Sequence, residues 1–531
     1  MENEYDNKKL KKYFEANIRR MEINKEFKPL LVDIMMRRAI AFNLSLQEIY
    51  RDMLVLANNL TKIEVGQIPD DYEGNVTGLY YSNERKILIS QEIVKKIIIS
   101  ENMENYEEVY DTLMHEVFHA LAMDENGNNT ISTINRYTNE VYTSLEEAIV
   151  SKAVDRCMHG RRVKEEENFP FFHQNKGAYT DITYITDLLE ATYGVSEKAF
   201  LRHAIQGKKN LAEFLSSVSG ESIDESLGYI DKIETNYSIL HKTLYESGFE
   251  GKELEDRVKD SLIAGFLVSY WTMYRCIENL DVSDLDTFGY RIERFKFGYN
   301  KMGELLRHVT KDFDYRFRNN NVSSYIFDLI KGTQEEGGLK LNIISEILKN
   351  KEKIPNEDLV KMLNFAKMER KEKKAFEEEE LFEKYGIELR AIGFVPLKKE
   401  SYFMYEDADF KSVRWNNSKI INMCGVFRPE YYKFKLNQFF ENVKKIFKKC
   451  VPNVFGKNET KQKMFGIGKD SEEQTTSNST FGELSSEDLE KFNKGMNKML
   501  ESYKNSETIK KERSMKQSDD ELDLEEQDDK E

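Results

Sequence analysis

The chain has 531 residues and a formal net charge of −16, with 40% hydrophobic and 12% aromatic residues. At about 150 residues per domain, this length corresponds to roughly two to four domains. The acidic balance argues against nucleic acid as the main partner, because phosphate binding requires a basic face. The apolar content is sufficient for a globular body, and the low number of prolines fits a mainly helical chain.

The first 220 residues combine helical and strand-like patterns. Apolar residues recur at helical spacing through residues 9–60, which predicts N-terminal helices. The period then changes, and Gly78–Ser90 contains two runs rich in Tyr and Ile around a polar turn, which predicts a β-hairpin. Helical patterns return near residue 106 and persist to about residue 380. We therefore expect an α+β, predominantly helical fold, with a first domain over 1–220 and a helical region over 221–380.

A smaller mixed α/β region is expected over residues 381–454. It ends in the basic amphipathic segment 433–449, which has six lysines and one glutamate beside several aromatic residues. The favoured interpretation is a helix that docks on the body through its aromatic side chains. Peripheral contact with an anionic membrane or a partner protein is the less favoured alternative.

Residues 455–531 are rich in Lys, Asn, Ser and Glu, and this composition predicts a mostly disordered, acidic tail. The last thirteen residues alone contain nine acidic residues and one lysine. One helix is expected within the tail, over 485–503, because its apolar residues follow helical spacing. We expect removal of 456–531 to leave thermal unfolding nearly unchanged, since such a composition buries little apolar surface.

Cysteine usage and the absence of apolar segments indicate the compartment. The four cysteines are far apart and form no Cys-x-x-Cys pair, so a thiolate zinc site is not expected and the thiols are expected to be reduced. No secretory signal is visible at the N-terminus. The longest apolar run, Leu262–Tyr274, is too short to span a bilayer and predicts a buried core helix. The expected location is the cytoplasm.

One motif carries clear chemistry. Residues 115–119 read His-Glu-Val-Phe-His, and the flanking apolar residues predict that they lie on a helix. Residues four positions apart share one face of a helix, so His115 and His119 can hold the same metal ion. Glu116 lies about 100° further round the helix and is therefore placed beside such an ion, as a base, and not as an equivalent ligand.

A zinc ion in a catalytic site needs a third protein ligand. A Gly and a His three and six residues after His119 would extend the motif, but Ala122 and Glu125 occupy these positions, which excludes the metzincin arrangement. The other solution is a glutamate on a separate helix. Helical spacing over Thr143–Asp155 provides one, with Glu147 followed by a small residue that allows close helix approach.

This combination resembles the gluzincin metallopeptidases, the superfamily of thermolysin, over about residues 60–220. Their second motif commonly reads Asn-Glu-Ala or Asn-Glu-Gly, so matching Glu-Ala places the ligand at Glu147, with Glu146 at the preceding position. The resemblance implies one catalytic Zn²⁺ held by His115, His119 and Glu147, with Glu116 as the general base. No other cofactor is implied.

The chain departs from the family at one supporting position. Thermolysin-like enzymes have an aspartate four residues after the ligand glutamate, where this chain has Ser151. The acceptor that orients a ligand histidine must then come from elsewhere, and a backbone carbonyl is one candidate. The residue that would stabilise the transition state also stays open among four candidates, which are His159, His173, Tyr179 and His203.

The leading interpretation is a zinc-dependent metallopeptidase that uses a metal-activated water to hydrolyse peptide bonds in intracellular proteins or peptides. The alternative is a non-catalytic gluzincin-like binding or regulatory protein whose C-terminal regions mediate partner interaction. A hydrolase that acts on a non-peptide amide is a third interpretation, which the motif does not separate from the first.

Overall fold

The computed structural model describes residues 7–69, 76–99, 103–134, 141–159, 182–245, 248–317, 320–367, 375–389, 391–392, 487–488 and 490–501. Across this part of the chain the fold is α+β and mostly helical, as predicted. The basic segment 433–449, most of the mixed region predicted over 381–454, and most of the tail lie outside the described residues.

Three helices form the N-terminal layer, in agreement with the predicted helical periodicity. They are α1 (Asn7–Arg20), α2 (Lys28–Ala41) and α3 (Leu46–Asn59). The start of α3 is fixed by a capping box, in which the Ser45 hydroxyl accepts from the Glu48 backbone N–H and the Glu48 carboxylate accepts from the Ser45 backbone N–H.

A three-stranded mixed sheet follows, with strands in the order β1-β3-β2. The strands are β1 (Lys62–Gly66), β2 (Gly78–Tyr81) and β3 (Lys86–Ser90). The antiparallel pair β2–β3 confirms the predicted hairpin, whereas β1 runs parallel to β3. Helices α4 (Gln91–Ile99) and α5 (Met103–Leu121) come next, and α5 packs against β2 and β3. The strand order makes β2 an edge strand, and α5 lies against it.

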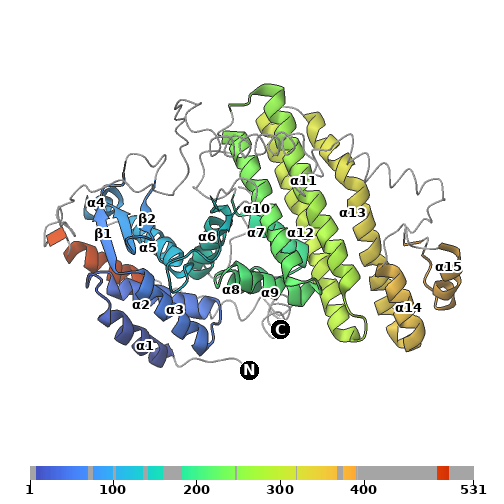
Figure 1. Ribbon diagram of the computed structural model, residues 1–531, viewed down its shortest axis with the longest axis horizontal. Helices are drawn as coiled ribbons and strands as arrows, with labels where there is room; N and C mark the ends of the chain where they lie inside the picture. Colours follow the sequence, from blue (N-terminus) through green and yellow to red (C-terminus); the bar gives the residue numbers. More distant parts are fainter. Residues whose placement is uncertain are drawn as a thin grey trace, which may run out of the picture.

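A polar connection with two short strands leads from α5 to a group of four helices. The strands are β4 (Thr133–Ile134) and β5 (Val141–Tyr142), and the helices are α6 (Ser144–His159), α7 (Tyr184–Tyr193), α8 (Glu197–Ala204) and α9 (Lys208–Ser219). Helix α6 packs against α5 and also contacts α2, α7, α8 and α10. It therefore lies between the sheet-containing part of the molecule and the long helices (Figure 1).

Long helices form the rest of the described body. They are α10 (Ile223–Tyr245), α11 (Gly251–Asn279), α12 (Leu285–Phe317) and α13 (Asn320–Lys349), followed by the short η1 (Lys351–Lys353), α14 (Asn356–Lys367) and α15 (Ala375–Lys384). The apolar run Leu262–Tyr274 lies in α11, and most of its side chains are buried, as expected for a core helix. Among the described residues, no helix combines the length and apolar character needed to cross a bilayer.

The long helices pack closely on the first part of the chain. The Arg291 and Arg294 side chains of α12 donate hydrogen bonds to the carbonyls of Tyr193 and Gly194 at the end of α7. A Cβ atom at Gly298 would overlap the Ala191 carbonyl, so only glycine permits this approach of the two backbones. The helical region is thus joined to α7 by buried contacts.

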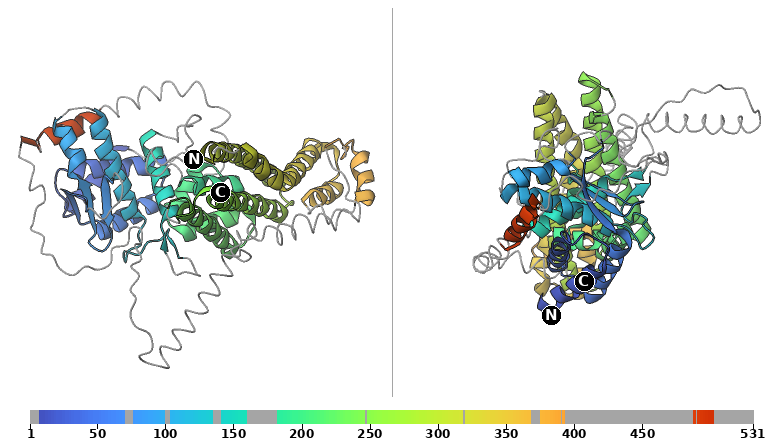
Figure 2. Two further views of the ribbon diagram at one scale, coloured as in Figure 1. Left: turned by 90° about the horizontal axis from the view of Figure 1, so that it is seen from above. Right: turned by 90° about the vertical axis from the view of Figure 1, so that its left-hand side faces the viewer.

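A C-terminal helix returns to the N-terminal end of the molecule. Residues 490–501 are helical and lie beside the first helices and the sheet, as the red segment in Figure 2 shows. Its apolar side chains are buried, and the ring of Phe492 lies 6.0 Å from that of Phe27. The expected helix therefore forms and docks. We expected removal of the tail to leave thermal unfolding nearly unchanged because the tail would bury little apolar surface. That assumption is wrong, because four apolar side chains of the helix are buried, namely Phe492, Met496, Met499 and Leu500.

A glycine in this helix can be used to test whether the helix docks, because replacing it by alanine should stabilise an exposed helix but destabilise a docked one. At an exposed helical site, glycine to alanine should stabilise by roughly 0.5–1 kcal/mol. Gly495 is buried against Tyr106 of α5, and a Cβ atom there would overlap the Tyr106 ring. We therefore expect Gly495→Ala to detach the helix and to increase hydrogen exchange over 490–501. The exposed neighbour Lys498→Ala is the control, and slower exchange in Gly495→Ala than in the wild type would contradict the docking.

Candidate metal centre

The histidine pair lies on α5, whose packing fixes the direction in which both rings point. One side of α5 is buried through an apolar stripe spaced four residues apart, formed by Val109, Leu113, Val117 and Leu121. The face next to this stripe carries His115 and His119, both only partly exposed. The rings lie 4.8 Å apart between centroids and project towards α6. The predicted helical placement of the pair is therefore present in the structure.

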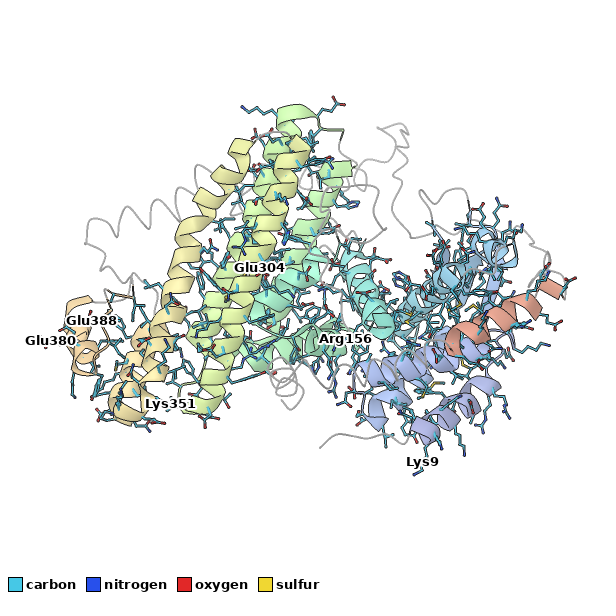
Figure 3. The ribbon with its side chains drawn as sticks, turned by 180° about the vertical axis from the view of Figure 1, so that it is seen from behind. Lys9, Arg156, Glu304, Lys351, Glu380 and Glu388 are labelled. Carbon is cyan, nitrogen blue, oxygen red and sulfur yellow. The ribbon has the colours of Figure 1, made fainter. Side chains whose placement is uncertain are left out.

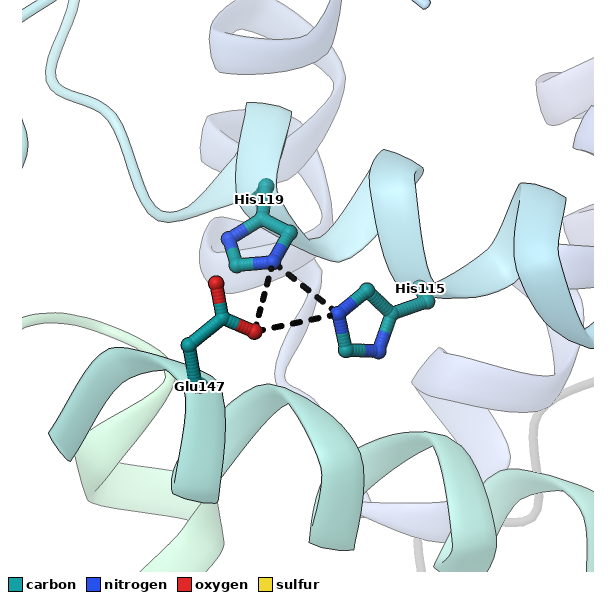
Figure 4. Close-up of side chains that lie close together, drawn as sticks. All are labelled: His115, His119 and Glu147. Atoms are coloured by element: carbon teal, nitrogen blue, oxygen red, sulfur yellow. Dashed lines mark hydrogen bonds and ion pairs between the residues drawn. The ribbon is translucent and has the colours of Figure 1, made fainter. Parts of the chain in front are cut away.

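Glu147, in the first turn of α6, completes a three-atom cluster with the two histidines (Figure 4). The Nε2 atoms of His115 and His119 are 3.1 Å apart. The Oε2 atom of Glu147 lies 3.3 Å from His115 Nε2 and 3.4 Å from His119 Nε2. Two helices thus bring the three sequence-predicted ligands together.

These distances can be compared with those of a bound ion. Ligands about 2.0–2.1 Å from a tetrahedral zinc ion are separated by about 3.3 Å, close to all three sides of the observed triangle. Two imidazoles and one carboxylate are also the donor types found in zinc sites with an open fourth position. Across the described ranges, these three residues are the group of His, Cys, Asp and Glu side chains whose geometry could hold a metal ion. The residues present therefore fit the implied ion.

Glu116 lies outside this triangle, on the side of α5 that faces β2. Its carboxylate accepts a hydrogen bond from the Tyr80 backbone N–H. A Cβ atom at Gly78 would lie 3.1 Å from Glu116 Cγ and would overlap Thr112, so the strand passes directly over this part of the helix. Burial raises the pKa of Glu116, and the neighbouring His115 and His119 offset only part of the rise. The side chain is thus held beside the cluster without joining it.

Glu146 supplies the orienting acceptor that the sequence did not identify. Its Oε1 atom lies 2.8 Å from His119 Nδ1, which leaves Nε2 of the same ring directed at the triangle. Its other oxygen accepts hydrogen bonds from Asn129 and Ser132 in the connection between α5 and α6. A carboxylate in this place fixes the tautomer and the orientation of a ligand histidine. The backbone carbonyl considered for this role is therefore not needed.

Ser151 takes no part in this arrangement. It lies one helical turn beyond Glu147, at the position where the family has an aspartate, and its buried hydroxyl has no hydrogen-bond partner in the described part of the chain. The carboxylate that contacts a histidine of the cluster belongs instead to Glu146, the residue before Glu147. The signal in the sequence was the pair Glu146–Glu147 itself, since adjacent residues on a helix diverge by about 100° and can face the two sides of one imidazole.

The charges of the cluster favour protonation of a histidine when no metal ion is bound. Burial alone would lower the pKa of His119, but the carboxylates of Glu147 and Glu146 outweigh it and raise the pKa well above its usual range. Burial alone would raise the pKa of Glu147, but His119 and His115 hold it well below its usual range. The favoured metal-free state is an imidazolium beside a carboxylate, so binding of a cation must release a proton.

The four candidates for transition-state stabilisation stay unassigned. His203, on α8, donates a hydrogen bond from Nδ1 to the Asn210 side-chain oxygen and stacks on Phe214 with the ring centroids 4.1 Å apart. His159 ends α6, and its side chain lies outside the described residues, as do His173 and Tyr179.

No protein-family model matches the chain, and no curated protein or solved structure matches it significantly. The gluzincin resemblance is therefore carried by the residues of the site alone.

The two adjacent glutamates should differ in their effect on metal binding. Glu147→Gln removes the anionic ligand and should cause the larger loss of zinc affinity. Glu146→Gln keeps an oxygen acceptor for His119 Nδ1, so the loss should be smaller, within the roughly 10–100-fold typical of residues that orient a ligand. Competition with a chromophoric chelator measures both. Loss of zinc from Glu146→Gln together with full retention in Glu147→Gln would place the ligand one residue earlier than we assign it.

Proposed function

We propose that this protein is a zinc-dependent metallopeptidase of the gluzincin type. The observation that carries the proposal is the triangle of His115 Nε2, His119 Nε2 and Glu147 Oε2, with sides of 3.1–3.4 Å, beside a buried Glu116. A pair of histidines alone is common on helices. A third ligand from a second helix, a carboxylate that orients His119 and a separate buried carboxylate together support a catalytic centre.

Glu116 is suited to the proton transfers of peptide hydrolysis. When bound, zinc supplies Lewis acidity that activates water and polarises the scissile carbonyl. The Glu116 carboxylate would take the proton of the attacking water and then donate it to the leaving amine. A base for these steps needs a pKa high enough to accept the proton and to retain it for the amine, and burial acts in this direction on the pKa of Glu116. The Tyr80 backbone N–H keeps the carboxylate in place during this exchange.

The alternative is a non-catalytic binding or regulatory protein with the same metal ligands. Two features favour it, which are the serine at position 151 and the large region beyond the first 220 residues. Against it, the carboxylate of Glu146 lies 2.8 Å from His119 Nδ1 and can orient that histidine. Glu116 also favours catalysis, since a structural metal site does not require a buried carboxylate that can act as a base beside the ion. A metal-loaded protein without turnover would support this alternative.

Replacement of Glu116 tests the proposal directly. Glu116→Gln keeps the size of the side chain and leaves the three ligands intact, so bound zinc should be unchanged. Cleavage of a proteome-derived peptide library should fall by roughly 10²–10⁴-fold, the range ascribed to a general base. Mass spectrometry of the new N-termini gives both the activity and the substrate preference.

The matched control for this test is Glu107→Gln, which alters an exposed glutamate on the same helix. It should cleave like the wild type. Equal cleavage by Glu116→Gln and the wild type would show that the activity does not arise from this site.

A further inference from the structure

The first turn of α6 is held by a side chain from the helical region. Glu234 lies on α10 and is fully buried. Its Oε1 atom accepts a hydrogen bond of 3.0 Å from the backbone N–H of Leu145, a residue 89 positions earlier in the chain. Leu145 directly precedes Glu146 and Glu147, so the contact lies at the point where α6 enters the metal centre.

This contact has the chemistry of a helix cap. The first four backbone N–H groups of a helix have no partner within it, and a carboxylate near them also interacts favourably with the helix dipole. Caps are usually supplied by the residue just before the helix. Here a distant helix supplies the acceptor. The position of the first turn of α6 is therefore tied to the position of α10.

A second set of buried charges ties α6 to the same part of the molecule. Lys152, on α6, lies 2.8 Å from Asp187 and 2.7 Å from Glu190 on α7. Glu190 also pairs with Lys301 of α12. Figure 3 shows the neighbouring Arg156 at the junction between α6 and the other helices, where it lies 3.6 Å from Glu197. These contacts fix the body of α6, whereas Glu234 contacts its first turn.

We propose that Glu234 is a positioning residue of the metal centre. Its hydrogen bond to Leu145 sets the height of the first turn of α6 above α5, and hence the distance of the Glu147 carboxylate from His115 and His119. Ligand positions must be held within about 0.5 Å for tight metal binding. Loss of this hydrogen bond should therefore lower the metal affinity although all three ligands are still present. The inference rests on the metal-binding part of the proposed function and does not depend on catalysis.

The role assigned to Glu234 extends the metal centre beyond the sequence segment that resembles a gluzincin. Helix α10 lies in the region 221–380, which the sequence suggested was a separate unit. Its contact with α6 makes it part of the support of the site. Substitutions in α10 should then alter metal affinity although no residue of α10 is a ligand.

Three variants test this role in the full-length protein. Glu234→Leu removes the acceptor at similar volume, and Glu234→Gln restores an oxygen acceptor. Tyr229→Phe is the control on the same helix, because it removes buried hydrogen bonds to Thr192 and Ser269 of other helices and none to α6. Zinc affinity is measured by chelator competition at a temperature well below the unfolding transition of each variant.

We expect Glu234→Leu to bind zinc roughly 10–100-fold more weakly, as for other residues that orient a ligand without contacting the metal. Glu234→Gln should recover most of the affinity. Tyr229→Phe should keep wild-type affinity even where its unfolding temperature is lower. A positioning role is thereby separated from a general loss of stability, which would weaken binding in both the leucine and the phenylalanine variants.

If Glu234→Leu does not fold, Glu234→Asp takes its place, since it keeps the buried charge but shortens its reach to Leu145. Wild-type zinc affinity in a folded Glu234→Leu or Glu234→Asp protein would overturn the positioning role and leave the proposed function intact. An equal loss of zinc affinity in Tyr229→Phe would also overturn the positioning role. A wild-type protein that binds no zinc would overturn both the positioning role and the proposed function.

Discussion

The approach of α6 to α5 is the contact on which the candidate site depends. Each helix alone presents ordinary polar side chains, and only their close packing brings Glu147 within 3.4 Å of both imidazoles. Ala148, fully buried beside the ligand, is a small residue at the side of this contact. Helix α5 is held by its packing on α3, α4 and the sheet, so the position of α6 decides the geometry of the cluster.

Such a cluster is unfavourable unless its charges are compensated. A buried carboxylate requires a cation or several hydrogen-bond donors, and two imidazoles about 3 Å apart cannot both be protonated at low cost. The pKa of His119 is raised by Glu147 and Glu146, and the pKa of Glu147 is lowered by the two histidines, so without a metal ion the charges favour an imidazolium beside a carboxylate. The surrounding contacts of Glu146, Glu234 and Lys152 hold the helices in this arrangement. A metal ion would satisfy the same groups with a larger charge.

The sequence predicted those features that depend on local periodicity. The spacing of His115 and His119 identified one helix face, and the alternating runs before them identified the hairpin β2–β3. The pairing of β1 with β3 was not predictable in this way, because a parallel pair requires a crossover and has no local turn signal. Helical spacing likewise indicated the C-terminal helix but not the surface near Phe27 and Tyr106 on which it docks.

The residues that position the ligands were not predictable from the sequence, because their contacts also depend on long-range packing. Glu146 was visible as a neighbour of the ligand, but its role depends on the path of the connection that carries Asn129 and Ser132. Glu234 lies 89 residues from the backbone group that it caps, so no spacing rule could connect the two. Long-range packing, which sequence periodicity does not encode, determines which side chains orient a ligand.

X-ray absorption spectroscopy of the zinc-loaded protein tests whether His115, His119 and Glu147 hold one zinc ion. We expect one ion per chain, with two imidazole nitrogens and oxygen ligands at about 2.0–2.1 Å and no sulfur shell near 2.3 Å. The imidazole signal should disappear in the His115→Ala/His119→Ala variant. A sulfur shell, or an unchanged spectrum and stoichiometry in that variant, would show that zinc is not held by these three residues.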